Sequence, residues 1–250
     1  KHFHEQYYVA SNVVIAMTGA VDRATAEQIA NAIDALLPAG NAAPQLPTPQ
    51  GMTADAEKRL PFPSSQTHIV VGGLSVDRRT TDWAPLYVGN EILGGGGFTS
   101  RLNQIIRQDN GLAYSVYSTV SPMAQAGPFM MGLQTRNDSA DKALGMVKDT
   151  FARFIADGPT QKELDDAKKN ILGSLPLTTA NNSSIVDQLG AMAFYDLPLD
   201  YLETLPVKIA AVTVDDVKRA FAEHIASHKQ LTLLVGGSDN AEAAGQESTP

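Results

Sequence analysis

The chain contains no cysteine, no long apolar run and no excess of basic residues. The missing cysteine excludes disulfides, thiol nucleophiles and thiolate metal sites, although it does not settle the compartment. No stretch reaches the ~18 apolar residues that a membrane span requires. The formal net charge of −8 argues against nonspecific nucleic-acid binding, which depends on a basic surface.

The composition is that of a folded protein. Hydrophobic residues make up 43% of the 250 positions and charged residues 18%, so a packed core is expected and global disorder is not. The first residue is Lys1 and not a methionine. We therefore expect a processed or shortened polypeptide, in which any targeting signal would be invisible.

The opening segment has the pattern of the end of a domain. Residues 12–18 (NVVIAMT) form a short β-branched run typical of a buried strand, and a helix is expected from Thr25, with Gln28 as its capping partner. One strand and one helix cannot bury a core alone. We predict four parts: residues 1–37 as the C-terminal fragment of a first α+β domain, residues 38–56 as a Pro/Ala-rich linker, residues 57–237 as a second α+β domain, and residues 238–250 as a disordered tail.

The second domain combines strands with helices. Apolar and β-branched runs between turn signals predict strands, and apolar residues at helical spacing after capping signals predict helices. The predicted strands are residues 57–60, 67–73, 113–120, 128–135 and 230–235, and the predicted helices span residues 82–93, 99–108 and 184–195 or are capped by Asp138, Thr160 and Thr213. This order predicts an α+β fold, a sheet with helices packed on one face.

The stretch 93–117 (LGGGGFTSRLNQIIRQDNGLAYSVY) is the most informative. It places Arg107 seven residues before Tyr114, across an Asn110-Gly111 pair typical of a helix end. A guanidinium offers several fixed donors and stays charged, and a phenol can donate without ionising, so both suit the oxyanion of a tetrahedral intermediate. For an isolated pair, a solvated arginine and a packed tyrosine would be the usual interpretation.

The four glycines at residues 94–97 also allow two interpretations. A phosphate loop needs glycines between a strand and a helix, usually with a Lys-Ser/Thr pair. Here a helical pattern precedes the glycines, and Phe98-Thr99-Ser100-Arg101 follows them. A flexible turn between two helices is the simpler interpretation, because glycine suits such a turn sterically.

The sequence offers no second set of catalytic groups. His224 and His228 are four residues apart, but no glutamate lies between them and no third ligand is close, so we interpret them as a polar helix end. His2, His4 and Glu5 cluster without a second cluster near them. No Ser-His-Asp or Cys-His arrangement can be assembled. We therefore assign no metal-binding and no cofactor-binding residue.

Three segments resemble the insulinase/pitrilysin-like zinc metallopeptidases, a family that includes the mitochondrial processing peptidase. HFHEQYYVASNVVIAMTGAVD resembles the strand near the end of the family's first domain, and ILGGGGFTSRLNQIIRQDNGLAYSVYS resembles the signature of the second domain. YLETLPVKIAAVTVDDVKRAFAEHI, followed by LTLLVGG, is similar to the closing helices and strand. The resemblance covers most of the chain and implies the C-terminal part of one half of a clam-shell peptidase.

The resemblance also implies a division of labour. Active members use an inverted zinc motif, H-x-x-E-H, which does not occur in this chain. The family carries an Arg/Tyr pair that faces the zinc across a peptide-holding cavity, and Arg107 and Tyr114 match that pair in type and separation. These two residues would then bind the scissile carbonyl, while zinc is held by the missing domain or by a partner subunit.

The implied partners are a peptide substrate and either a homologous zinc-bearing subunit or a second copy of the chain. By this interpretation the chain is inactive alone, binds no nucleic acid and has no membrane span. A bacterial periplasmic or secreted location is favoured over the cytoplasm. The alternative is a non-catalytic homologue that serves as a scaffold or binds peptides without hydrolysing them.

Overall fold

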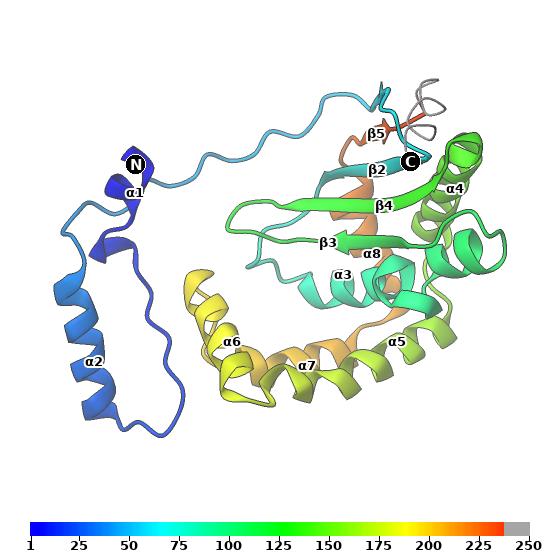
Figure 1. The fold of residues 1–250 in the computed structure, drawn as a ribbon. Helices are drawn as coiled ribbons and strands as arrows, with labels where there is room; N and C mark the ends of the chain where they lie inside the picture. The colour runs from blue at the N-terminus through cyan, green and yellow to red at the C-terminus, as the bar shows by residue number, and fades with distance from the viewer. Residues whose placement is uncertain (238–250) are drawn as a thin grey trace, which may run out of the picture. The chain divides into compact units, whose positions relative to one another are not determined.

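The structure is a computed structural model that describes residues 1–237 (Figure 1). The predicted disordered tail, residues 238–250, lies outside the described residues. Contacts divide the chain into two compact units. The first unit consists of Lys1–Thr48 and Leu172–Pro206, and the second unit consists of Pro49–Ile171 and the chain from Val207 onward.

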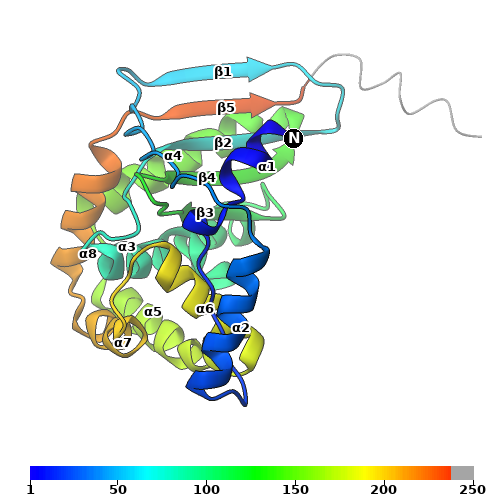
Figure 2. The same ribbon diagram turned by 90° about the vertical axis from the view of Figure 1, so that its left-hand side faces the viewer.

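The second unit is built on a five-stranded sheet with the order β1-β5-β2-β4-β3, which Figure 2 shows from top to bottom. The strands are β1 (Ala56–Leu60), β2 (Gln66–Leu74), β3 (Val116–Val120), β4 (Pro128–Arg136) and β5 (Leu231–Val235). β1 runs parallel to β5, and the other neighbours are antiparallel. All five predicted strands are present, although β3 starts three residues later than predicted because its pairing with β4 begins at Val116.

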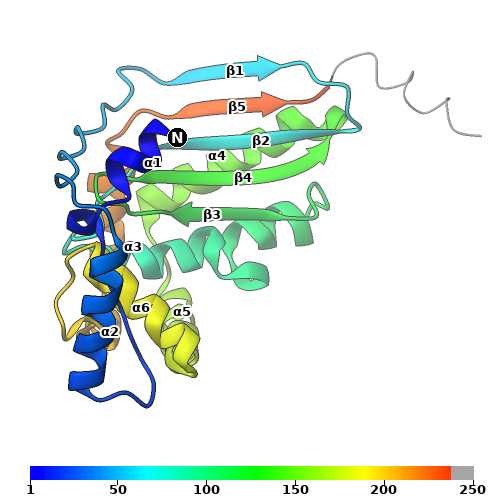
Figure 3. The ribbon, with the colours of Figure 1, turned by 60° about the vertical axis from the view of Figure 1, so that its left-hand side comes forward.

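Helices cover one face of this sheet. On β2, Thr67, Ile69 and Val71 are buried whereas His68 is exposed, which is the period-two pattern of a strand with one covered face. α4 (Ala140–Asp157) packs behind β2 and β4 (Figure 3). Aromatic rings fill the layer between sheet and helices, with contacts among Phe129, Phe151, Phe154 and Phe221. The predicted α+β fold is therefore confirmed.

Local capping signals set the starts of two further helices. α5 (Gln161–Ser174) follows a capping box in which the Thr160 amide donates to Glu163 at 2.7 Å and the Glu163 amide donates to Thr160 Oγ1 at 3.2 Å. α8 (Val214–Phe221) begins with the same device at Thr213. The predicted cap of α4 was wrong, because Asp138 accepts from Arg136 and Ser139 instead of capping the helix.

The remaining helices of residues 1–237 are α1 (His2–Tyr7), α2 (Arg23–Leu36), α3 (Trp83–Asn90), α6 (Asn182–Phe194) and α7 (Tyr201–Ala211). α2 begins two residues earlier than predicted, because Asp22 caps it and accepts from the Thr25 amide at 2.8 Å. None of these helices, nor any other within residues 1–237, has the length and apolar composition needed to cross a bilayer.

The prediction of a buried strand at residues 12–18 was wrong. Val13 and Val14 are 41% and 50% exposed, and no described residue pairs with this segment in a sheet. A strand is defined by hydrogen bonds to a neighbour, so a β-branched run without a neighbour remains irregular.

Candidate functional site

Arg107 and Tyr114 lie together at the corner between a helix and the sheet. Arg107 lies in the last turn of a π-helical segment, η4 (Asn103–Gln108), and Tyr114 lies two residues before β3. The Arg107 Cζ atom lies 5.0 Å from the centroid of the Tyr114 ring. The structure therefore brings the two residues into direct contact.

A left-handed glycine makes this corner. Gly111 has a φ of +60°, a conformation that residues with a Cβ rarely adopt. Its amide donates to the Arg107 carbonyl at 2.9 Å, and the Leu112 amide donates to the Ile106 carbonyl at 2.9 Å. The helix ends at Asn110-Gly111, as the sequence predicts, and the chain turns back so that Tyr114 returns to Arg107.

A second aromatic ring contacts the same guanidinium. The centroid of the Phe98 ring lies 4.4 Å from Arg107 Cζ, closer than that of Tyr114. Phe98 is 64% exposed, so most of its ring is open to solvent. The sequence did not identify Phe98 as a site residue. The one feature of the sequence that could have pointed to it is its position directly after four glycines.

The Arg107 guanidinium has aromatic neighbours but no acceptor. Within residues 1–237 it forms no ion pair with a carboxylate and donates no hydrogen bond to another residue. Arg107 is nevertheless partly buried. A cation that is held in place while its N–H donors stay unused can bind an acceptor from outside the chain.

The Tyr114 hydroxyl is equally available. The Tyr114 side chain is 85% exposed, and within residues 1–237 its hydroxyl has no hydrogen-bond partner. Arg107 and Tyr114 thus present a charged donor and a neutral donor side by side at an exposed corner. Such a pair suits a carbonyl oxygen that gains negative charge.

The glycine run forms a turn between helical segments. α3 continues as a π-helical segment, η2 (Glu91–Gly95), so the helix reaches two residues farther than predicted. A short 3-10 turn, Gly97–Thr99, follows directly. Because a helix and not a strand precedes the glycines, the phosphate-loop interpretation does not fit this geometry.

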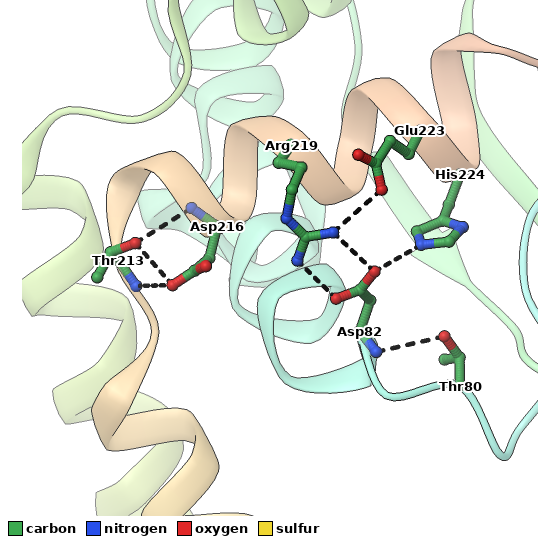
Figure 4. A network of polar contacts seen from close by, with 7 residues as sticks. All are labelled: Thr80, Asp82, Thr213, Asp216, Arg219, Glu223 and His224. Atoms are coloured by element: carbon green, nitrogen blue, oxygen red, sulfur yellow. Dashed lines mark hydrogen bonds and ion pairs between the residues drawn. The ribbon is translucent and has the colours of Figure 1, made fainter.

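A second polar cluster lies where α3 meets α8 (Figure 4). Asp82 accepts from Arg219 at 2.7 and 3.0 Å and lies 2.7 Å from His224 Nε2. Arg219 also donates to Glu223 at 3.0 Å. The hydrogen bonds from Arg219 and His224 outweigh the effect of burial and lower the pKa of Asp82 to about 2. The cluster links the start of α3 to α8 through an ionised carboxylate that forms an ion pair with Arg219.

The described residues do not fit the zinc of a peptidase. Asp82, Glu223 and His224 bring three ligand atoms within 4.8 Å of one another, and no other His, Asp or Glu group of residues 1–237 does so. However, the Arg219 guanidinium already donates to both carboxylates, so a second cation there would meet charge repulsion. The sequence also lacks the H-x-x-E-H motif.

Comparisons with known proteins agree on one family. A sequence profile described as "Peptidase M16 inactive domain" matches residues 1–171. The crystal structure of a peptidase M16 inactive domain from Pseudomonas fluorescens is 44% identical and superposes with a TM-score of 0.89 over 95% of this chain and 57% of that chain.

Two sequence relatives carry contrasting names. The "Non-peptidase homolog YmxG" of Helicobacter pylori is 38% identical over 141 residues, which are 56% of this chain and 32% of that protein. The "Uncharacterized zinc protease YmxG" of Bacillus subtilis is 30% identical over 193 residues, which are 76% of this chain and 46% of that protein. The chain thus spans about a third to about half of the length of these curated relatives.

Proposed function

The chain belongs to the peptidase M16 inactive-domain family, and from this premise we propose that it is the substrate-binding, non-zinc part of an insulinase-like metalloendopeptidase. In this function, Arg107 and Tyr114 bind the carbonyl of the peptide bond that is cleaved. The substrate class is peptides or short unfolded segments.

One observation carries the proposal: the Arg107 guanidinium lies against two rings with its N–H donors unused, beside an exposed Tyr114 hydroxyl. A peptide carbonyl becomes a stronger acceptor as the tetrahedral intermediate forms. Hydrogen bonds from a charged donor then strengthen more than those from water, which has to reorient. The pair therefore favours the transition state over the bound substrate.

The zinc of such a peptidase would lie in another domain or in a homologous partner subunit, where it would supply the activated water. This chain would bind and orient the peptide and would not hydrolyse it alone. The absence of H-x-x-E-H from the sequence supports this division.

Residues 1–37 are proposed to complete a preceding α+β domain. Val13 and Val14 are about half exposed, and Ile29, Ile33 and Leu36 of α2 are exposed as well. Apolar side chains in a strand-like segment and on one helix face normally pack against a sheet or further helices. Residues 38–56 would be the linker to the second domain, residues 57–237, of which Leu172–Pro206 forms a compact unit with Lys1–Thr48.

A second candidate function is non-catalytic. The Helicobacter pylori relative is named a non-peptidase homologue, and a subunit without zinc ligands can serve as a scaffold or bind peptides. In that case Arg107 and Tyr114 would be a relic pair, and their removal would not change turnover.

Reconstitution separates the two candidates. The chain is mixed with the zinc-bearing homologue that copurifies with it, and cleavage of a quenched fluorescent peptide is measured before and after mixing. The proposed function requires activity that appears on mixing and falls about 10²-fold or more with Arg107→Ala, since one donor to the oxyanion is lost. Arg153→Ala is the control, because Arg153 is exposed on α4.

Activity on mixing that is indifferent to Arg107→Ala would favour scaffolding. Capture of the peptide without cleavage, even with the zinc-bearing homologue present, would favour a peptide-binding module.

A further inference from the structure

The turn after α3 fixes the backbone of Phe98. Gly97 has a φ of +59°, which turns the chain sharply between η2 and the next helical segment. The Thr99 hydroxyl donates to the Gly96 carbonyl at 3.0 Å, and the Ser100 hydroxyl donates to the Gly97 carbonyl at 2.8 Å. The turn is therefore closed by hydrogen bonds on both sides of Phe98.

A side chain next to Arg107 ties this turn to η4. Gln108 Nε2 donates to the Phe98 carbonyl at 2.6 Å. The residue adjacent to Arg107 thus anchors the backbone from which the Phe98 ring projects. The ring has little burial to stabilise it, since 64% of Phe98 is exposed, and it forms a cation–π contact with the Arg107 guanidinium.

We propose that Phe98 is a positioning residue: the glycine turn places its ring against Arg107 so that, together with Tyr114, it orients the guanidinium before the peptide arrives. This inference rests on the proposed function of Arg107. It assigns a purpose to Gly97, which the proposed function alone leaves unexplained.

The physical advantage lies in the kind of contact. A carboxylate would hold the guanidinium equally well, but it would occupy the N–H donors that the substrate carbonyl needs. A ring holds the cation through its π face and leaves the donors available. Orienting a long arginine side chain before binding reduces the conformational entropy that binding would otherwise cost.

The expected effect on turnover is modest and specific. Loss of one exposed cation–π contact corresponds to about a two- to fivefold change. Phe98→Leu should lower kcat/KM of the assembled peptidase by about that factor, and Phe98→Tyr, which keeps the ring, should restore it. In an Arg107→Ala background, Phe98→Leu should have no further effect, because there is no guanidinium left to position.

The test combines the kinetics of Phe98→Leu, Arg107→Ala and the double variant with an NMR measurement on the full chain in the absence of the zinc-bearing homologue. Ring currents should displace the Arg107 Nε–Hε NMR resonance from the position typical of arginine. Phe98→Leu should move it back, and Phe98→Tyr should not. Phe62→Leu is the control for unspecific changes, because Phe62 is an exposed phenylalanine of the same unit that has no recognised contact with Arg107 within residues 1–237. Circular dichroism and thermal melting establish that each variant is folded.

The outcomes are distinct. If Arg107→Ala leaves turnover unchanged, the proposed function fails, whatever the spectra show. If Arg107→Ala slows turnover but Phe98→Leu matches the wild type, or adds its full effect in the Arg107→Ala background, the positioning role of Phe98 is wrong. An Arg107 resonance that Phe98→Leu does not move would also overturn it, without any need for substrate.

Discussion

Arg101 and Arg107 lie six residues apart on one helical stretch, and each lies over an aromatic ring, yet they differ in their hydrogen bonds. Arg101 donates to both carboxylate oxygens of Glu163, at 2.6 and 2.7 Å, and to the Gly158 carbonyl at 3.0 Å. Arg107 lies against the rings of Phe98 and Tyr114, and the described chain supplies it with no acceptor. Arg101 therefore uses its Nε and Nη2 donors within the chain, whereas Arg107 donates to no residue of the described chain.

The difference shows how a structural arginine differs from one that can bind a ligand. Arg101 is held by hydrogen bonds to Glu163 of α5 and to the Gly158 carbonyl, so its removal should weaken the fold. Arg107 is fixed in place without being satisfied, so its removal should weaken binding and leave the fold intact. The following predictions test this contrast, from the largest expected effect to the smallest.

Tyr114→Phe should lower the turnover of the assembled peptidase by about 10²-fold, the lower end of the range for one lost donor to an oxyanion. It should leave the melting temperature unchanged, because the side chain is 85% exposed. The matched control is Tyr117→Phe, three residues farther on in β3. Equal turnover for Tyr114→Phe and wild type would remove this hydroxyl from the site.

Arg101→Ala should destabilise the chain by about 2 kcal/mol, because it leaves a partly buried Glu163 carboxylate without its charged donor. For a domain of this size, that corresponds to a fall in melting temperature of roughly 4–8 °C in a calorimetric scan. Arg107→Ala is the comparison variant, and its melting temperature should equal that of the wild type. A lower melting temperature for Arg107→Ala than for Arg101→Ala would contradict the assignment of Arg101 to the fold and of Arg107 to binding.

Acid unfolding should depend on Glu163 and not on Arg107. Burial raises the pKa of Glu163, but the hydrogen bonds from Arg101 and Thr160 outweigh it and lower the pKa from 4.5 to about 2. A carboxyl with a lowered pKa in the folded state contributes stability above pH 4.5, and that contribution is lost as the pH falls towards 2.

Between pH 4.5 and about 2, Glu163→Gln should therefore reduce the slope of the free energy of unfolding against pH. The reduction should correspond to about one bound proton. Arg107→Ala should leave the slope as it is in the wild type. The free energy of unfolding, measured by urea titration at several pH values, provides the comparison. An unchanged slope for Glu163→Gln would show that folding does not lower the pKa of the Glu163 carboxyl.

The smallest effect concerns Asn103, which lies between the two arginines. Asn103 is buried, and its Oδ1 atom has no hydrogen-bond partner within residues 1–237. Asn103→Leu removes an unsatisfied acceptor and should raise stability by about 0.5–1 kcal/mol. A loss of stability in thermal melting would indicate that a partner, such as a bound water, satisfies the amide in solution.

Features that depend on residues close together in the sequence were predicted well. The strands β2 and β4 are long β-branched or apolar runs between turn signals, and they appear within two residues of their predicted bounds. The capping box at Thr160 and the cap at Thr213 depend on residues three positions apart, so both were predicted locally, although the capping-box partner Asp216 was not. The corner at Gly111 follows from a single Asn-Gly pair.

Features that depend on distant residues were missed. Glu163, which satisfies Arg101, lies far along the chain from it, so the sequence alone could not tell Arg101 from Arg107. Phe98 reaches Arg107 only because the glycine turn folds back. α7 was not predicted separately, because Pro206 lies inside it and proline normally ends a helix.

The most direct test of the account is a double-mutant cycle on the peptidase assembled with its zinc-bearing homologue. Since Arg107 and Tyr114 are proposed to donate to one carbonyl oxygen, each single variant should lower kcat/KM by about 10²-fold or more, and the double variant Arg107→Ala/Tyr114→Phe should lose less than the product of the two. Wild-type kcat/KM in the double variant would contradict the central claim, because the corner would then be an ordinary part of the surface.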